Sequence, residues 1–301
     1  MRATVAPGIE LEYESFGRER DPAVLLVMGL ACQLTHWPEP LCQRLAAAGY
    51  RVIRFDNRDI GLSTRFGDRG RPSIPRTWLR RQLGLPARAA YTLEDMAGDV
   101  LGLMDALGLA QAHVVGASMG GMIAQHLAVR APQRLASLGL IMTTSGARGL
   151  PQAHWKLQLR MIRRPEGRDR DSLIRHSVRT WQLIGSPAYP VPEEELTSRI
   201  AGHFDRSYHP AGVLRQLDAI LASGSRARLV KQIRTPTLVL HGQSDPLVPV
   251  AAAHDLARRI PNARLHLFPG MGHDLPTPLL GPIADQLLGH FDAARARRAA
   301  A

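Results

Sequence analysis

Apolar positions follow two different rhythms along this chain. Short runs that are continuously apolar, or that alternate with polar positions, predict strands. These runs cover residues 10–16, 23–28, 51–55, 113–117, 135–142, 237–240 and 264–268. Between them, apolar positions recur with the spacing of a helix. The predicted helices cover residues 40–49, 93–108, 119–130, 251–259 and 279–298. Such alternation is typical of a mostly parallel sheet with helices on both faces.

The alternation stops between Thr143 and Lys231. This stretch is rich in arginine and has mostly helical spacing. A helical insertion after one strand, followed by the return of the sheet, predicts a cap over the carboxyl ends of the strands, the edge where such sheets bind ligands. We therefore expect a core formed by residues 1–143 and 232–301, and a helical cap formed by residues 144–231.

A second irregular stretch, residues 61–90, combines basic and apolar positions. Its members are Arg65, Arg69, Arg71, Arg76, Arg80, Arg81 and Arg88, beside Trp78, Leu79, Leu83 and Leu85. We expect a surface loop with one short helix folded onto the body of the protein. The alternative is a basic amphipathic segment that contacts a membrane or the cap.

The composition is that of an ordinary globular protein. Of the 301 residues, 45% are hydrophobic and 21% charged, so the chain can bury a substantial core in one large domain with an insertion. No apolar window of about eighteen residues predicts a membrane span. The first residues lack the apolar stretch of a secretory signal, so we expect a cytoplasmic protein. Cys32 and Cys42 match neither a zinc nor a redox motif, and we expect free thiols.

The formal net charge of +12 is the one unusual bulk property. Such a charge can attract nucleic acid, anionic lipid or an acidic substrate. However, only two of the 38 basic residues are lysine, Lys156 and Lys231, the arginines are spread along the chain, and no nucleic-acid-binding module accompanies them. We interpret the excess as coding bias, and we expect a small-molecule substrate, no nucleic-acid partner, and a monomer or homodimer.

A glycine-rich run lies where one predicted strand turns into a helix. It reads Gly116-Ala117-Ser118-Met119-Gly120-Gly121. A sharp strand-to-helix turn of this kind exposes the serine hydroxyl and needs small neighbours, because strand and helix approach closely there. The helix also directs its free N–H groups and positive dipole end at the place where an oxyanion would form. The pattern predicts Ser118 as a nucleophile; the alternative is a glycine-rich turn that contains a serine by chance.

A nucleophilic serine needs a base, and the base needs a group that orients it. When the nucleophile lies in a strand-to-helix turn, the expected order along the chain is serine, acid, histidine. Asp245 follows the predicted strand 237–240, and His273 follows the strand 264–268 in a glycine-flanked loop. Both therefore fall at the carboxyl edge of the sheet. We predict His273 as the base and Asp245 as the acid, although an aspartate before proline can also cap a turn.

The other titratable candidates have simpler explanations. Of the twelve histidines, the eleven besides His273 fall in regular elements, where packing explains them, or in irregular segments. Asp274 is adjacent to His273, but neighbouring residues rarely direct a carboxylate at the imidazole beside them. We therefore interpret Asp274 as structural.

The turn after the strand 23–28 supplies a second group for the predicted site. Its sequence, Met28-Gly29-Leu30, allows the backbone to bend over the nucleophile. The N–H of Leu30 can then pair with the N–H of Met119 as an oxyanion hole. His36 and Trp37 follow closely and can line the same pocket, although a tryptophan more often has a packing role.

Several ordered motifs together resemble the α/β-hydrolase superfamily, from about residue 10 to residue 290. They are the Val27-Met28-Gly29 turn, the Phe55-Asp56-Asn57-Arg58-Asp59-Ile60-Gly61-Leu62-Ser63-Thr64 loop, and the segments around Ser118, Asp245 and His273. The resemblance implies an α/β-hydrolase fold with a mostly parallel eight-stranded sheet, a helical cap and a Ser–His–Asp triad. The Met-Gly turn, this loop and the Pro-Gly-Met-Gly-His end are similar to bacterial serine carboxylesterases of the aclacinomycin methylesterase type.

The reaction implied is hydrolysis of a small to medium carboxylic ester through an acyl-enzyme intermediate, with no metal and no organic cofactor. A serine nucleophile argues against haloalkane dehalogenase or epoxide hydrolase chemistry, for which the family uses a carboxylate. Hydrolysis of a lactone or of a C–C bond, and cofactor-free perhydrolysis, remain open because the fold alone does not separate them. A non-catalytic relative that binds a ligand is a further alternative, which three filled triad positions disfavour.

Overall fold

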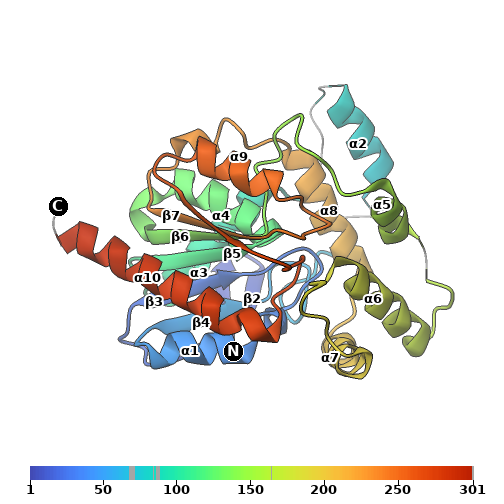
Figure 1. The fold of residues 1–301 in the computed structure, drawn as a ribbon, viewed down its shortest axis with the longest axis horizontal. Helices are drawn as coiled ribbons and strands as arrows, with labels where there is room; N and C mark the ends of the chain where they lie inside the picture. The colour runs from blue at the N-terminus through green and yellow to red at the C-terminus, as the bar shows by residue number, and fades with distance from the viewer. Residues whose placement is uncertain (68–71, 84, 86–88, 164, 300–301) are drawn as a thin grey trace.

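An eight-stranded sheet forms the centre of the computed structural model, which describes residues 1–67, 72–83, 85, 89–163 and 165–299. Its strands are β1 (Arg2–Ala6), β2 (Ile9–Phe16), β3 (Ala23–Val27), β4 (Arg51–Phe55), β5 (Ala112–Ala117), β6 (Leu135–Ile141), β7 (Thr237–Gly242) and β8 (Arg264–Phe268). They lie in the order β1-β2-β4-β3-β5-β6-β7-β8. The pairs β1–β2 and β2–β4 are antiparallel and the other pairs parallel. The predicted mostly parallel sheet is therefore confirmed (Figure 1).

The first strand, β1, is the element that the apolar pattern did not predict. Ala3 is its one buried residue, so its sequence carries no run of buried apolar positions. Its place comes from pairing with β2, in which Ala3 lies opposite Leu11. An edge strand of this kind depends on its partner more than on its own side chains.

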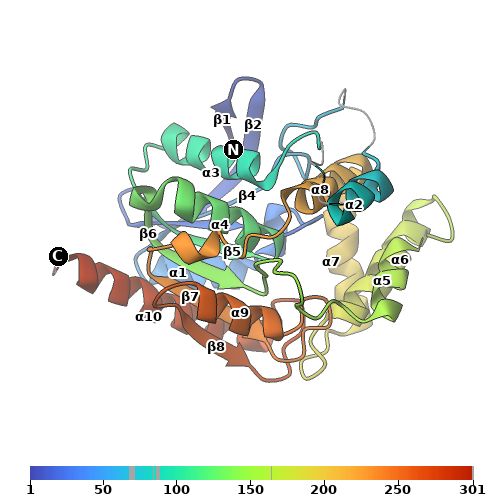
Figure 2. The same ribbon diagram turned by 90° about the horizontal axis from the view of Figure 1, so that it is seen from above.

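Helices cover both faces of the sheet. They are α1 (Glu39–Ala47), α2 (Ile74–Gln82), α3 (Leu93–Ala106), α4 (Met119–Arg130), α5 (Trp155–Ile162), α6 (Arg170–Ile184), α7 (Glu193–Arg206), α8 (Pro210–Ser223), α9 (Ala251–Arg259) and α10 (Leu280–Ala299). One core cluster contains α3, α4 and α9, and a second contains α1 and α10 (Figures 1 and 2). In β3, Leu25 and Val27 belong to the first cluster and Val24 and Leu26 to the second. Burial on both faces explains why this strand is continuously apolar.

The start of α3 is set by its own side chains. The Thr92 hydroxyl accepts a hydrogen bond from the N–H of Asp95 at 3.1 Å, and the Asp95 carboxylate accepts one from the N–H of Thr92 at 2.8 Å. This reciprocal pair satisfies N–H groups that the end of a helix leaves free. The predicted start of this helix at residue 93 is therefore confirmed.

In the described part of the chain between β6 and β7, four helices, α5 to α8, follow one another. They stand together at one end of the sheet (Figures 1 and 2). A small apolar cluster joins α6 to α7 through Ile174, Val178, Leu196 and Ile200. By contrast, α8 joins the main core through Ala219. We call residues 144–231 the insertion; their role as a cap stays a prediction.

The irregular segment 61–90 contains the helix α2, which packs against α8 of the insertion. The segment contains one short helix, as expected. The expectation that this helix folds onto the body is wrong, and the alternative of contact with the cap segment describes the position of α2 better. Trp78 and Leu79 are 52% and 53% exposed, whereas Thr77 is buried. The helix thus turns apolar side chains to solvent while a polar residue packs inward. Three arginines of this segment lie outside the described residues: Arg69, Arg71 and Arg88.

Two bulk expectations concern the thiols and the membrane. Cys32 and Cys42 are free, as predicted. Burial raises the pKa of the Cys42 thiol to about 12, so this thiol stays protonated and unreactive. Among the helices of the described ranges, none combines the length and the apolar composition needed to cross a bilayer.

Candidate active site

Ser118 lies in the sharp turn between β5 and α4, as its sequence context predicts. Its backbone has φ 53° and ψ −119°, a region in which a residue with a side chain is strained. Its N–H donates to the carbonyl oxygen of Ile141 at 2.9 Å, and its carbonyl oxygen accepts from the Thr143 hydroxyl at 2.6 Å. The end of β6 therefore holds the strained turn in place.

Three glycines make room for this turn. A Cβ atom at Gly120 would lie 2.0 Å from the carbonyl oxygen of Val27, and one at Gly121 would lie 2.6 Å from the Thr143 side chain. A Cβ atom at Gly116 would lie 2.4 Å from the carbonyl oxygen of Gly120. Any larger residue would displace its neighbours, which is the physical reason for the glycine-rich run.

Side chains from three separate loops meet at the turn. The Nε2 atom of His273 lies 3.0 Å from the Oγ atom of Ser118, and its Nδ1 atom lies 2.7 Å from the Oδ2 atom of Asp245. Asp245 follows β7 and His273 follows β8, so parallel strands bring both side chains to the edge where Ser118 lies. Asp245 and His273 are 5% and 7% exposed. Of the three residues singled out from the sequence, the predicted base His273 thus lies within hydrogen-bond distance of both the predicted nucleophile and the predicted acid.

The Asp245 carboxylate has further partners near its own loop. Its Oδ1 atom accepts hydrogen bonds from the N–H groups of Leu247 and Val248 at 2.9 and 2.8 Å. The Nε2 atom of His241 lies 3.5 Å from Oδ2 and donates to the carbonyl oxygen of Val248 at 2.8 Å. Burial lowers the pKa of His241, so a neutral ring supports this loop. The sequence reasoning assigned His241 to packing; its position four residues before Asp245 is the signal that could have placed it here.

The turn that follows β3 lies directly against the nucleophile. A Cβ atom at Gly29 would be 3.0 Å from the Cβ atom of Ser118 and 3.5 Å from its Oγ atom. Leu30 comes next in this turn, and Met119 begins α4, whose first N–H groups have no partner within the helix. Within the described residues, the N–H groups of Leu30 and Met119 donate to no protein acceptor. Both groups lie in the segments from which the sequence analysis predicts the oxyanion donors.

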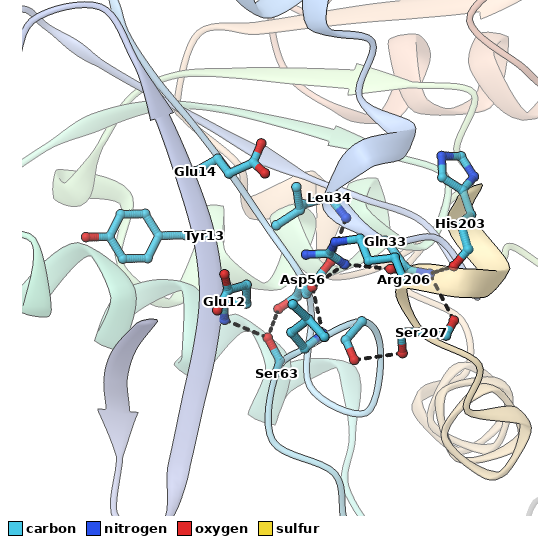
Figure 3. Close-up of polar contacts among 12 residues, drawn as sticks. Glu12, Tyr13, Glu14, Gln33, Leu34, Asp56, Ser63, His203, Arg206 and Ser207 are labelled. Carbon is cyan, nitrogen blue, oxygen red and sulfur yellow. Dashed lines mark hydrogen bonds and ion pairs between the residues drawn. The ribbon is translucent and has the colours of Figure 1, made fainter. Parts of the chain in front are cut away.

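A polar network holds Gln33 and Leu34, at the end of the turn that follows β3 (Figure 3). The Asp56 carboxylate accepts hydrogen bonds from the N–H of Leu34 at 2.7 Å and from Arg206 of α7 at 2.8 Å. Arg206 also donates to the side-chain oxygen of Gln33 at 2.5 Å. The Nε2 atom of Gln33 donates to two carbonyl oxygens at the end of α7, those of His203 and Ser207. The sequence reasoning missed Gln33 and Arg206, because only the fold brings them together.

The loop after β4, which resembles a family motif, supports the same region. The side-chain amide of Asn57 donates to the carbonyl oxygen of Met28 at 2.9 Å. Arg58 forms a bidentate ion pair with Asp99 of α3 at 2.5 and 2.6 Å, and both side chains are buried. The loop thus connects the turn beside Ser118 to α3 in the helix layer.

Two histidines face each other where α7 meets the chain after the segment 29–34. The ring centroids of His36 and His203 are 3.8 Å apart. The Nδ1 atom of His36 accepts a hydrogen bond from the N–H of Gln33 at 3.0 Å, which requires an unprotonated nitrogen. Burial and, to a smaller extent, the charges of Arg199 and Arg206 lower the pKa of both histidines, that of His203 to about 4.

We expect the protein to lose stability as the pH falls from about 6.5 towards 4. In this range an unfolded histidine is protonated, whereas folded His203 is not, so unfolding takes up a proton. The free energy of unfolding should fall by up to about 1.4 kcal/mol per pH unit for this group, and should not change on its account above about pH 6.5. Urea unfolding across this range measures the slope. His203→Gln should give a shallower slope; equal slopes in the two proteins would contradict the expectation.

Solved structures with a similar fold span almost the whole chain. A meta-cleavage product hydrolase from Pseudomonas fluorescens IP01 aligns with a TM-score of 0.76 and 20% identity, covering 98% of each chain. An enol-lactonase from Burkholderia xenovorans LB400 aligns with a TM-score of 0.72 and 22% identity, covering 96% of this chain and 99% of the lactonase. At these identities the likeness shows the fold alone.

Two sequence relatives also extend over nearly the full length. A rhodomycin D methylesterase from Streptomyces sp. (strain C5) is 30% identical, with 95% of this chain and 96% of the relative covered. A second rhodomycin D methylesterase, from Streptomyces peucetius, is 29% identical with the same coverage. They confirm the resemblance to bacterial methylesterases. The family described as alpha/beta hydrolase fold matches residues 22–276, and this chain therefore belongs to the α/β hydrolase fold family.

Proposed function

We propose that this protein is a serine carboxylesterase that cleaves small to medium carboxylic esters through an acyl-enzyme intermediate. The observation that carries the proposal is the series of hydrogen bonds from Asp245 to His273 to Ser118, with distances of 2.7 and 3.0 Å. The two methylesterase relatives at 30% and 29% identity support ester chemistry. Because both relatives are methylesterases, methyl esters should be among the first substrates tested.

In the proposed acylation step, Ser118 Oγ attacks the ester carbonyl while His273 Nε2 accepts the hydroxyl proton. The Asp245 carboxylate accepts a hydrogen bond from the Nδ1–H of His273, so Nε2 is free to act as base. The negative charge of Asp245 stabilises the imidazolium that forms. We assign the N–H groups of Leu30 and Met119 as donors to the oxyanion. The intermediate collapses when His273 returns the proton to the leaving oxygen, which departs as the alcohol.

Deacylation repeats the sequence with water in place of the serine. His273 takes a proton from water as the water oxygen adds to the acyl carbon, and the same N–H groups bind the second oxyanion. When this intermediate collapses, the carboxylic acid leaves and Ser118 Oγ recovers its proton from His273. Each step moves a proton or an acyl group between groups of this chain, substrate and water, so the proposed reaction needs no metal or organic cofactor.

The proposal is tested with the purified protein and p-nitrophenyl esters of increasing acyl length, followed by simple methyl esters. We expect hydrolysis that Ser118→Ala abolishes and that Ser225→Ala, at an exposed serine, leaves unchanged. A fluorophosphonate probe should label Ser118 in the parent protein, and the labelled position can be mapped by mass spectrometry. If no ester in the series is cleaved and Ser118 is not labelled, the proposal is wrong.

A further inference from the structure

Gln216 is a buried side chain of α8 that joins two loops of the core. Its Oε1 atom accepts a hydrogen bond from the N–H of Ala31 at 3.2 Å, and its Nε2 atom donates to the carbonyl oxygen of Arg58 at 2.9 Å. The residue has no solvent exposure. A buried amide engaged at both ends cannot turn without leaving a polar group unpaired. Gln216 therefore sets the position of both loops relative to α8.

Ala31, the residue that Gln216 holds, has an unfavourable backbone conformation. Its φ is 63°, in the left-handed region that residues with a Cβ atom adopt only at a cost. Such a conformation persists where the surroundings impose it. Ala31 directly follows Leu30, and Gly29 lies against Ser118. The conformation of Ala31 thus helps to set the direction of the peptide groups beside the nucleophile.

The helix that carries Gln216 is fastened to the core at the neighbouring residue. Arg215 donates two hydrogen bonds of 2.8 Å to the carboxylate of Asp59, and both side chains are buried. Asp59 also accepts a hydrogen bond from the N–H of Phe66 at 2.9 Å. A buried bidentate pair restrains orientation as well as distance. The Arg215–Asp59 pair therefore fixes the part of α8 from which the Gln216 side chain reaches Ala31.

The other polar contacts between the insertion and this turn lie further along the chain. Arg206 and Asp56 act on Gln33 and Leu34 (Figure 3). By contrast, the hydrogen bond that the Ala31 N–H donates to Gln216 joins the insertion to the residue that directly follows Leu30. Loss of this side chain should therefore loosen the turn at the point nearest the nucleophile.

We propose that Gln216 is a positioning residue for the oxyanion hole: it holds Ala31 so that the Leu30 N–H stays directed at the oxygen that becomes charged when Ser118 attacks. The inference rests on the proposed function and adds a residue of the insertion to it. An oxyanion donor stabilises the transition state more than the bound substrate, because the charge develops during the reaction. Loss of Gln216 should therefore lower kcat with little change in KM.

Gln216→Glu separates this role from packing, since the side chain keeps its size. A protonated carboxyl group reproduces both hydrogen bonds, because its carbonyl oxygen accepts from Ala31 and its hydroxyl donates to Arg58. An ionised carboxylate cannot donate to the Arg58 carbonyl and repels it. The kcat of Gln216→Glu relative to that of the parent should therefore rise as the pH falls. Gln216→Met has no titratable group, so its kcat ratio should not change with pH.

Charged groups around this position are the same in the parent and in both variants. They are the pairs Arg58–Asp99 and Arg215–Asp59, with His209 3.0 Å from Arg215. Dividing each variant's kcat by that of the parent at the same pH removes these shared contributions, so the remaining pH dependence reports on position 216.

The inference is tested by steady-state kinetics. The substrate is the p-nitrophenyl ester that the parent protein cleaves fastest. For Gln216→Met we expect kcat to fall about 10- to 100-fold, less than the ~10²- to 10³-fold lost with a whole oxyanion donor, with KM within about threefold. Ser223→Ala is the matched control, because it removes a hydrogen bond of 3.0 Å that the N–H of Leu93 donates to the end of the same helix, α8, and leaves the bond to Ala31 intact. Its kcat should stay within about twofold of the parent value.

Inhibition by an alkyl trifluoromethyl ketone is a second measurement, which should not change if Gln216 has a purely structural role. Ser118 adds to this ketone to give a charged oxygen that needs the same donors. Its inhibition constant should rise in Gln216→Met in proportion to the loss of kcat/KM, whereas binding of the corresponding methyl ketone should not change. Unchanged kcat, or a rise in KM alone, would overturn the inference.

The outcomes also separate the two proposals. If circular dichroism shows that Gln216→Met does not fold, the pH dependence of Gln216→Glu decides, and a constant kcat ratio overturns the role of Gln216. If the parent protein shows no Ser118-dependent turnover at all, the proposed function fails instead. If turnover depends on Ser118 but does not change with the residue at position 216, the proposed function is supported and the inference about Gln216 is wrong.

Discussion

The double variant Ser118→Ala/His273→Ala is expected to hydrolyse p-nitrophenyl esters no more slowly than either single variant. In the proposed mechanism each residue acts through the other, since His273 Nε2 lies 3.0 Å from the oxygen that it would activate. Without the serine hydroxyl the base has no proton to take, and without the base the hydroxyl is a weak nucleophile. Either single substitution should lower kcat by about 10⁶-fold, and the second should add almost nothing.

Four proteins measured in one assay test this expectation: the parent, the two single variants and the double variant. Circular dichroism and the temperature of unfolding should show that all four are folded. His254→Ala, at an exposed histidine of α9, is the control for removing an imidazole and should keep the parent kcat. If the losses of the single variants multiply in the double variant, Ser118 and His273 do not act as a unit.

Asp245→Asn should lower kcat by about 10⁴-fold while the protein stays folded. The Oδ1 atom accepts from two backbone N–H groups, those of Leu247 and Val248. The oxygen of an asparagine would keep these two bonds, which turns its NH₂ group towards His273 Nδ1. That nitrogen would then have to accept a hydrogen bond, and the ring proton would move to Nε2, the atom that must accept the proton of Ser118. The substitution thus selects the wrong tautomer of the base.

The neighbouring Asp274 provides a matched control. Its carboxylate accepts a hydrogen bond from the Ser186 hydroxyl, so Asp274→Asn makes the same chemical change one residue after His273. We expect its kcat to stay within about tenfold of the parent value. A small effect of Asp245→Asn, or a larger effect of Asp274→Asn, measured as kcat at fixed pH, would show that the acid has been misassigned.

Much of the fold could be predicted because its signals are local. The predicted bounds of α4, α9 and β8 agree with the structure, since a buried strand is continuously apolar and a helix repeats its apolar face every 3.6 residues. The turn at Ser118 could be predicted for the same reason, because the strand, the glycines and the helix are contiguous. β1 could not, because its single buried residue leaves no periodic pattern.

Local sequence patterns could not predict the contacts that depend on packing between distant segments of the chain. The sequence analysis expected the helix of the arginine-rich segment 61–90 to fold onto the body, whereas α2 packs on α8 of the insertion. His241 was assigned to packing, whereas its ring lies 3.5 Å from the Asp245 carboxylate. In each case the residue type fits several environments equally well, and the partner is chosen by how whole elements pack.

By itself, the sequence determined the alternation of strands and helices and the candidates Ser118, Asp245 and His273, because each depends on residue types at the end of a recognisable strand. The tertiary structure alone decided what holds the turn beside the nucleophile. The hydrogen bond from Ala31 to Gln216 joins positions 185 residues apart, and a glutamine within a helix carries no local sign of its partner. That partner is set by the packing of α8 on the core, a property of the whole chain.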